Sequence, residues 1–233
     1  MRANEVIERI DAFCDAVPRR RARADEHGPL VLFVPTGPGW PYYARPRPGP
    51  RPRVTVADIR AVRARQRELI IPESFEWIEQ TAPEMAAAAS EASLVVQTHP
   101  LMVLSAPPLA PPRPAERDKI AADYDGGTIE MLRERLRSGH SVLAAAFGPD
   151  GPVAAGSCQA VDGTAEITGV GVLPSSRRQG LGAAVTALLA GDALARGVDT
   201  IFLSASDDSV ARIYARTGFR VIGTAMIAEP AVG

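Results

Sequence analysis

The stretch Val172-Leu173-Pro174-Ser175-Ser176-Arg177-Arg178-Gln179-Gly180-Leu181-Gly182-Ala183 decides how this chain is interpreted. A strand ends, Pro174 breaks it, and glycines open a helix. The first N–H groups of a helix lack partners within the helix, and the helix dipole favours negative charge there. Gly180 and Gly182 have no Cβ, so a pyrophosphate can approach the backbone closely. Arg177 and Arg178 add donors suited to phosphate oxygens. The stretch predicts an anion site; the alternative is a tight turn with solvated arginines.

The elements around this stretch form an α+β pattern. Gly148-Pro149-Asp150-Gly151 and Asp162-Gly163 are turn signals between apolar runs, so an antiparallel meander of three strands is expected. The expected elements are strands at 141–147, 152–161 and 164–173, a helix at 181–196, a strand at 200–205, a helix at 207–216 and a strand at 219–227. This order predicts a mixed, mostly antiparallel sheet flanked by helices.

The first half of the chain is predicted to form a separate α+β segment. Its expected elements are helices at 4–17, 55–69 and 82–92 and strands at 30–34, 42–44, 74–78 and 94–104. Residues 105–118 are proline-rich and are interpreted as a linker. We therefore divide the chain into an N-terminal domain at 1–104, the linker, and a C-terminal domain at 119–233. Short helices are expected at 115–124 and 129–136.

Composition excludes several classes of protein. The chain has 233 residues, 46% of them hydrophobic and 23% charged, and a formal net charge of −1, so no global field attracts nucleic acid or a membrane. Its two cysteines, Cys14 and Cys158, are far apart, and no metal-ligand spacing is present. Cys158 is interpreted as an apolar filler, with a thiol near a cleft as the alternative. No apolar run is long enough to span a membrane, and we expect a cytoplasmic protein without a metal.

Other nucleotide-binding motifs fit less well. The chain lacks a GxxxxGK[ST] run, which excludes a P-loop. Gly180 and Gly182 supply two glycines of a dinucleotide fingerprint, but an antiparallel meander precedes them and a Rossmann unit needs parallel strands.

The segment from Val172 to Gly182 resembles the acetyl-coenzyme A motif of the GNAT acyltransferase superfamily, Arg/Gln-x-x-Gly-x-Gly/Ala after a strand end. Downstream, Ile213-Tyr214-Ala215-Arg216-Thr217-Gly218-Phe219 is similar to that family's Leu-Tyr-x-x-x-Gly-Phe signature. The two motifs occur in the family's order, and the resemblance covers residues 129–227. It implies acetyl-CoA as co-substrate and a thioester held between two splayed strands, here 166–173 and 200–205.

The resemblance also implies which residues contact the co-substrate. The N–H of Val170 would bond the thioester carbonyl, and Val172 would pair with the pantetheine arm. Gly169 and Gly171 fit a bulge, a close ligand approach, or packing against a helix. The complete expected set is Val170, Val172, Arg177, Arg178, Gln179, Gly180, Leu181, Gly182, Ala183 and Asp207. Asp207 is interpreted first as a charge at a helix N-terminus and second as a ligand contact.

Two side chains are expected to perform catalysis. Tyr214 occupies the family's general-acid position, and a phenol can protonate a departing thiolate. The alternative is a tyrosine that fills the core. Glu166, in the context Ala165-Glu166-Ile167, matches the catalytic glutamate of the histone-acetyltransferase branch and would take a proton from an ammonium. A water chain as base, or a purely structural glutamate, is the alternative.

The first half also looks like a degenerate copy of the second. At an offset of 125, Trp77 matches Phe202, whereas Tyr214 corresponds to Ala89. The fold could thus consist of two tandem halves, the first without the acid and the phosphate loop; the alternative is chance similarity of two α/β segments. The acceptor side departs from the family, because the first strand is either absent or supplied by 101–104. The chain also ends soon after 219–227, which leaves little for a last strand.

These observations predict an N-acetyltransferase that moves an acetyl group to a primary amine by direct attack through a tetrahedral intermediate. The acceptor could be a small molecule or a peptide, and a homodimer is left open. The alternative function is a non-catalytic acyl-CoA-binding or interaction module. Nucleic-acid binding by the arginine-rich segment 19–67 is disfavoured, because few aromatic residues accompany its arginines.

Overall fold

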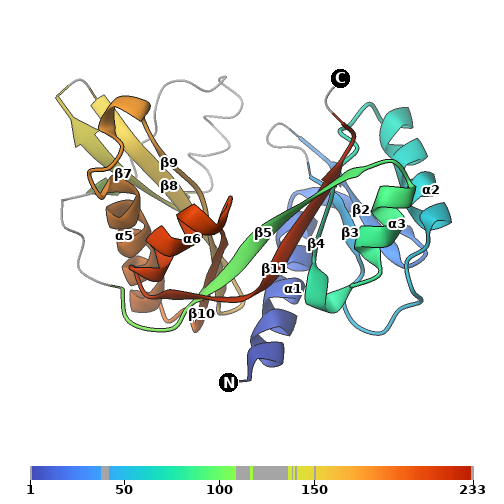
Figure 1. The fold of residues 1–233 in the computed structure, drawn as a ribbon, viewed down its shortest axis with the longest axis horizontal. Coiled ribbons are helices and arrows are strands. Elements are labelled where there is room, and N and C mark those ends of the chain that lie inside the picture. The colour runs from blue at the N-terminus through green and yellow to red at the C-terminus, as the bar shows by residue number, and fades with distance from the viewer. Residues whose placement is uncertain are drawn as a thin grey trace. The chain divides into compact units, whose positions relative to one another are not determined.

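The computed structural model describes residues 2–37, 42–108, 116–117, 136–137, 139, 141–149 and 151–231. The chain divides into two compact units, residues 1–99 with 223–233, and residues 100–222. These units differ from the predicted domains at 1–104 and 119–233. The difference arises because two strands, β5 (Val95–Leu104) and β11 (Phe219–Glu229), each run from one unit into the other (Figure 1). Each unit is described by itself below.

The sheet of the unit 100–222 has the strand order β5-β10-β9-β8-β7-β6. Its strands are β6 (Glu116–Arg117), β7 (Ser141–Gly148), β8 (Gly151–Val161), β9 (Thr164–Val172), β10 (Thr200–Ser204) and the end of β5. Neighbours pair antiparallel except β9 and β10, which are parallel. The predicted antiparallel meander is therefore confirmed.

Two helices complete this unit, α5 (Leu181–Ala195) and α6 (Asp208–Ala215). α5 contacts β7, β8 and β9, and its buried face includes Val185, Leu189 and Ala190 (Figure 1). These side chains share one apolar core with Ile167 of β9 and Leu203 of β10. Burying this core supplies the main driving force for the unit.

Two expectations about the edges of this sheet are wrong. Residues 101–104 do not supply the first strand; Leu101–Val103 pair antiparallel with Phe202–Ser204 of β10 instead. The edge beside β7 is taken by β6, which lies in the stretch interpreted as linker and short helix. β5 therefore lies next to β10.

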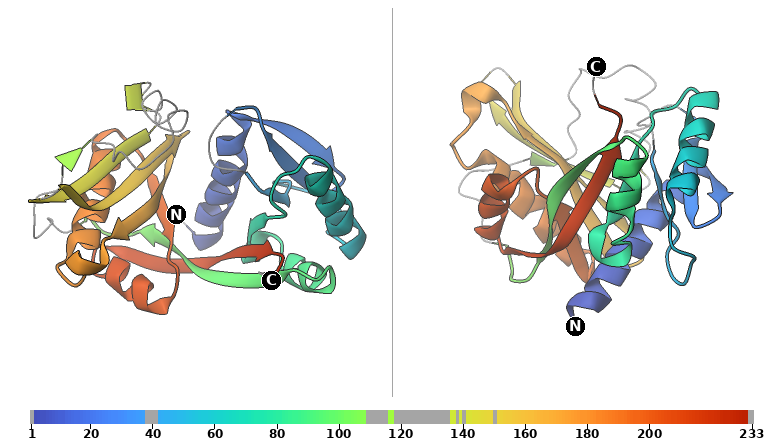
Figure 2. Two further views of the ribbon diagram at one scale, coloured as in Figure 1. Left: turned by 90° about the horizontal axis from the view of Figure 1, so that it is seen from above. Right: turned by 45° about the vertical axis from the view of Figure 1, so that its right-hand side comes forward.

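The unit 1–99 with 223–233 has the strand order β1-β2-β3-β4-β11. Its elements are α1 (Ala3–Arg19), β1 (Ala22–His27), β2 (Leu30–Pro35), β3 (Ala44–Pro46), α2 (Val56–Glu68), β4 (Phe75–Ile78), the short 3₁₀ helix η1 (Glu79–Thr81), α3 (Met85–Glu91) and the start of β5. Strands β3 and β4 are parallel, and residues 225–228 of β11 pair antiparallel with β4. One core joins Leu32 and Phe75 of the sheet to Ile59 of α2 and Met85 of α3. Figure 2 shows the ribbon of these elements in two further views.

Most predicted elements of this unit are confirmed, including α1, α2 with its cap at Thr55, β4 and α3. The sequence did not predict β1, because Ala-Arg-Ala-Asp-Glu-His has no apolar alternation. Within the part of the chain that the structure describes, β1 is an edge strand that pairs with β2 alone. The returning strand expected at 42–44 occurs at Ala44–Pro46. Most of each helix predicted at 115–124 and at 129–136 lies outside the described residues.

Both units repeat one order of elements, namely a hairpin, a strand, a helix, a strand, a helix and a strand. In both, the strands before and after the first of these helices pair in parallel, β3 with β4 and β9 with β10. The tandem origin of the two halves stays a prediction that a superposition of the two sheets would test. Over the described part of the chain, no helix has the length and hydropathy to cross a membrane.

Candidate active site

The parallel strands β9 and β10 separate partway along their length. Their pairing covers Thr164–Glu166 against Thr200–Phe202, whereas β9 continues to Val172 and β10 to Ser204. Beyond Glu166 and Phe202 the two strands no longer share a ladder. The separation of β9 and β10 therefore begins within 166–173 and 200–205, the two segments that the resemblance predicts to splay.

A bulge interrupts β9 just past this point. Ala155 of β8 faces Gly171 and Ser157 faces Thr168, so one residue of β8 opposes two of β9, Gly169 and Val170. Gly169 has a φ of +63°, which a residue with a Cβ rarely adopts. The predicted bulge is confirmed, and it leaves Val170 outside the regular pairing with β8.

The N-terminus of α5 carries no side-chain cap. Its N-cap is Gly180, with left-handed backbone (φ +77°), and the first N–H bonded to a carbonyl of the helix is that of Ala184, to Gly180 O at 3.0 Å. The N–H groups of Leu181, Gly182 and Ala183 therefore point out of the helix end. These three N–H groups have no acceptor among the described residues, and together with the helix dipole they suit an anion.

The bulge and the helix end lie together. A Cβ built on Gly182 would meet Val172 Cγ2 at 3.5 Å and Val170 Cγ1 at 3.9 Å, which are ordinary contact distances. The Arg177 Nε donates to the Val172 carbonyl oxygen at 3.3 Å. Arg178 and Gln179 are exposed in the same turn, whereas the Leu181 side chain is buried in the core.

Tyr214 lies in the last turn of α6, and its side chain is buried in the core that Val170 and Val172 also contact. Its ring is tilted against Phe219, with 6.4 Å between centroids. Burial raises the pKa of the Tyr214 hydroxyl above its usual value of 10. The phenol therefore keeps its proton at neutral pH, as a general acid requires.

Gly218 explains the spacing between Tyr214 and Phe219. Its φ is +96°, and a Cβ there would lie 2.7 Å from the Ala106 carbonyl oxygen. The Gly218 carbonyl also accepts the N–H of Ser105 at 2.9 Å. Only glycine fits this close approach of two backbones, which fixes the turn that leads from α6 into β11.

Glu166 and Asp207 have different surroundings. Glu166 is half-buried on β9, alternating with the buried Ala165 and Ile167, and lies where the β9–β10 ladder ends. Asp207 is the N-cap of α6; its carboxylate accepts the N–H groups of Ser209 at 2.7 Å and Val210 at 3.0 Å. These bonds and that of the Ser209 hydroxyl lower the pKa of Asp207 to about 2. The helix-cap interpretation of Asp207 is thus confirmed, and its ligand role stays a prediction.

Sequence reasoning missed a pair of hydroxyls beside the bulge. Ser157 Oγ and Thr168 Oγ1 are 3.0 Å apart, and Thr168 shares the face of β9 that carries Glu166. The alternation Ala165-Glu166-Ile167-Thr168 was the signal that could have revealed it. Cys158, by contrast, is buried, and burial raises the pKa of its thiol to about 12, as suits an apolar filler. Among the described residues, no three His, Cys, Asp or Glu side chains gather as metal ligands would.

Residues 106–219 match the family model described as the acetyltransferase (GNAT) family. This range includes both sequence motifs, the splayed strands and the bulge. No curated protein matches the chain.

Several solved structures share the fold over most of the chain. A GCN5-related N-acetyltransferase from Kribbella flavida is 24% identical with a TM-score of 0.75, and the match covers 97% of this chain and 96% of that one. A GCN5-related N-acetyltransferase from Sphaerobacter thermophilus is 18% identical with a TM-score of 0.61, covering 94% and 86%. A tandem GNAT protein from the clavulanic acid biosynthesis pathway is 14% identical with a TM-score of 0.54, covering 88% and 79%.

Proposed function

Because the C-terminal half of this chain belongs to the GNAT acetyltransferase family, we propose that the protein is an acetyl-CoA-dependent N-acetyltransferase acting on a primary amine. The acceptor is a small molecule or a peptide with a free amino group. The acetyl group passes directly from the thioester to the amine, without an acyl-enzyme.

One observation carries this proposal, the open N-terminus of α5 beside the bulge of β9. Gly182 leaves room for a diphosphate against three free N–H groups, and Arg177 and Arg178 supply positive charge to the same turn. A coenzyme A diphosphate held there would direct its pantetheine arm along Val172 toward the opening between β9 and β10.

The residues of the opening fit the steps of acyl transfer. The acceptor ammonium loses a proton to Glu166, directly or through water, and the amine attacks the thioester carbon. The N–H of Val170 stabilises the oxygen of the tetrahedral intermediate, because a fixed donor gains strength as charge develops. The C–S bond then breaks, and the Tyr214 hydroxyl donates its proton to the departing thiolate. The second proton of the attacking nitrogen passes to water, and water returns a proton to the Tyr214 phenolate.

The test is release of the coenzyme A thiol from acetyl-CoA with a panel of primary amines. We expect turnover with at least one amine, and a fall in kcat of about 10²–10⁴-fold in Tyr214→Phe, with coenzyme A affinity unchanged. Tyr42→Phe, in the other unit, is the matched control and should act like the wild type. Binding of acetyl-CoA without turnover over a broad panel would contradict an enzyme and favour a non-catalytic acyl-CoA-binding module.

A further inference from the structure

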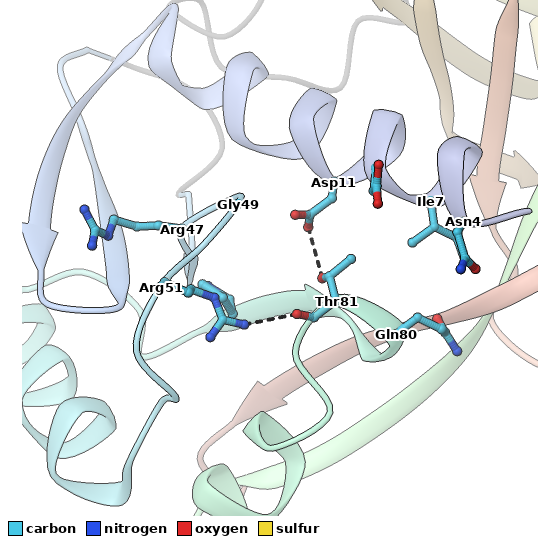
Figure 3. A pocket seen from close by; sticks show the side chains of 10 residues that line it. Asn4, Ile7, Asp11, Arg47, Gly49, Arg51, Gln80 and Thr81 are labelled. Atoms are coloured by element: carbon cyan, nitrogen blue, oxygen red, sulfur yellow. Dashed lines mark hydrogen bonds between the residues drawn. The ribbon is translucent and has the colours of Figure 1, made fainter.

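A polar pocket lies within the unit 1–99 with 223–233. Its volume is about 350 Å³, at the small end of the range of about 300–1,000 Å³ for small-molecule sites. One wall is the first half of α1, with Asn4, Glu8 and Asp11. The other wall comes from the loop after β3, with Arg51, and from η1, with Thr81 (Figure 3).

Arg51 supplies a fixed positive charge to the second wall. Its side chain is only 9% exposed and pairs with Glu84 at 2.8 Å. Nη1 donates to Glu84 and to the Pro52 carbonyl. Nη2 donates to the Thr81 carbonyl at 3.1 Å (Figure 3). A guanidinium has five N–H donors, so two of them have no recorded acceptor among the described residues.

The α1 wall carries the opposite charge. Asp11 is 11% exposed, and its Oδ1 accepts hydrogen bonds from the buried Arg45 and from the Thr81 hydroxyl. Burial raises the pKa of the Asp11 carboxyl in spite of Arg45, so a cation in the pocket would stabilise its charged form. Glu8, one turn earlier, is exposed and has no ion-pair partner among the described residues.

From these two walls we infer that the pocket binds a small zwitterion of the amino-acid class, with its carboxylate toward Arg51 and its ammonium toward Glu8 and Asp11. A free phosphate would bring negative charge to two carboxylates, and a simple amine would leave the spare donors of Arg51 unused. The nearby N-terminus of α2 offers no anion site of its own, because the side chains of Thr55 and Asp58 already occupy it. This site is separate from the one proposed for acetyl transfer.

The experiment is calorimetric titration of the full chain with the twenty common L-amino acids, inorganic phosphate and ethylamine. We expect at least one amino acid to bind, and its N-acetyl and decarboxylated analogues to bind at least tenfold more weakly. Glu8→Gln should weaken that amino acid about tenfold, since a charge-assisted bond is lost. Glu79→Gln removes the same charge from the exposed start of η1, outside the pocket lining, and should leave binding unchanged.

Three outcomes would overturn the inference. The first is that no amino acid binds at concentrations up to roughly 10 mM. The second is that phosphate or ethylamine binds as tightly as the amino acid. The third is that both glutamate variants lose binding equally. A loss of binding in Glu8→Gln also separates this site from the proposed acceptor site, because Glu8 lies in the unit 1–99 with 223–233 and Glu166 lies in the unit 100–222. Glu8 is exposed, so its variant should fold normally.

Discussion

The N-termini of α2 and α5 occupy the same place in the element order of their units, but one is capped by side chains and the other is not. α2 follows β3, and α5 follows β9. The end of α2 is closed by a capping box, in which Thr55 Oγ1 accepts the Asp58 N–H at 3.3 Å and Asp58 accepts the Thr55 N–H at 2.8 Å. The end of α5 begins with Gly180 and has no cap. The backbone N–H groups at the start of α5 are therefore available to a ligand. At the start of α2, the side chains of Thr55 and Asp58 accept backbone N–H groups instead.

The same contrast extends to the helix that follows. At the offset of 125, Tyr214 of α6 corresponds to Ala89 of α3, which is fully buried in the apolar core of its unit. The unit 100–222 therefore has both the uncapped helix end and Tyr214. In the other unit, the matching helix end is capped and alanine stands at the position that matches Tyr214. Acyl-CoA chemistry is expected in the unit 100–222 alone.

The largest expected effect comes from closing the end of α5. Ala183→Asp places a carboxylate at the third helical position, where α2 has Asp58. As Asp58 does in α2, this carboxylate would accept the N–H of the N-cap residue, here Gly180, and its charge would repel a diphosphate. The affinity for coenzyme A should therefore fall about a hundredfold or more. Thermal stability should hold or rise slightly, because acidic residues stabilise a helix N-terminus.

Ala183→Asn is the matched control, since it has nearly the same volume without the charge. It should lose much less affinity than Ala183→Asp. If the two variants bind coenzyme A equally, or if both bind as the wild type does, the helix end is not the diphosphate site.

The second expected effect concerns Glu76, a half-buried carboxyl group in the other unit. Burial raises the pKa of Glu76 on β4 from 4.5 to about 7, with Arg45 lowering it and Glu229 raising it. The folded state keeps this proton up to about pH 7 and the unfolded state releases it near 4.5. The contribution to stability is therefore complete below pH 4.5 and is lost as the pH rises through 7.

Glu76→Gln removes this titration. Between pH 4.5 and 8, the free energy of unfolding of the variant relative to the wild type should rise by up to roughly 3 kcal/mol. Denaturant unfolding at several pH values measures this, with the exposed Glu79→Gln as control. A difference between Glu76→Gln and wild type that does not change with pH would contradict a Glu76 carboxyl that stays protonated in the folded state.

The smallest expected effect comes from opening the end of α2. Thr55→Ala removes the N-cap hydroxyl and should lower the free energy of unfolding by about 1 kcal/mol. It should not create a second coenzyme A site, because Asp58 keeps its negative charge at this end. Urea unfolding and a coenzyme A titration of the variant test both statements; new coenzyme A binding would show that the cap alone separates the two ends.

The sequence predicted the unit 100–222 better than the other unit because its signals are local. Turn dipeptides, the glycines of the α5 entry and the Tyr-x-x-x-Gly-Phe spacing each fix their own neighbourhood, and Gly169 and Gly218 indeed adopt positive φ. Pairing between distant strands could not be predicted in this way. β5 lies against β10, and β11 against β4, across more than 90 residues of sequence, and no local pattern specifies such partners.

Buried polar groups were missed for a related reason. Arg45 and Asp11 come from a strand and a helix far apart in sequence, and each alone looks like an ordinary surface charge. Their pairing, and the pocket beside it, depend on how α1 packs on its own sheet. The catalytic roles of Tyr214 and Glu166 are likewise proposals that rest on motif position, although the structure shows how each is held.

Calorimetric titration of the wild-type chain with coenzyme A tests the central contrast most directly. One open helix end predicts saturable binding of a single coenzyme A per chain. Two bound molecules would mean that the capped end of α2 is no barrier, and no binding at all would mean that the uncapped end of α5 holds no diphosphate.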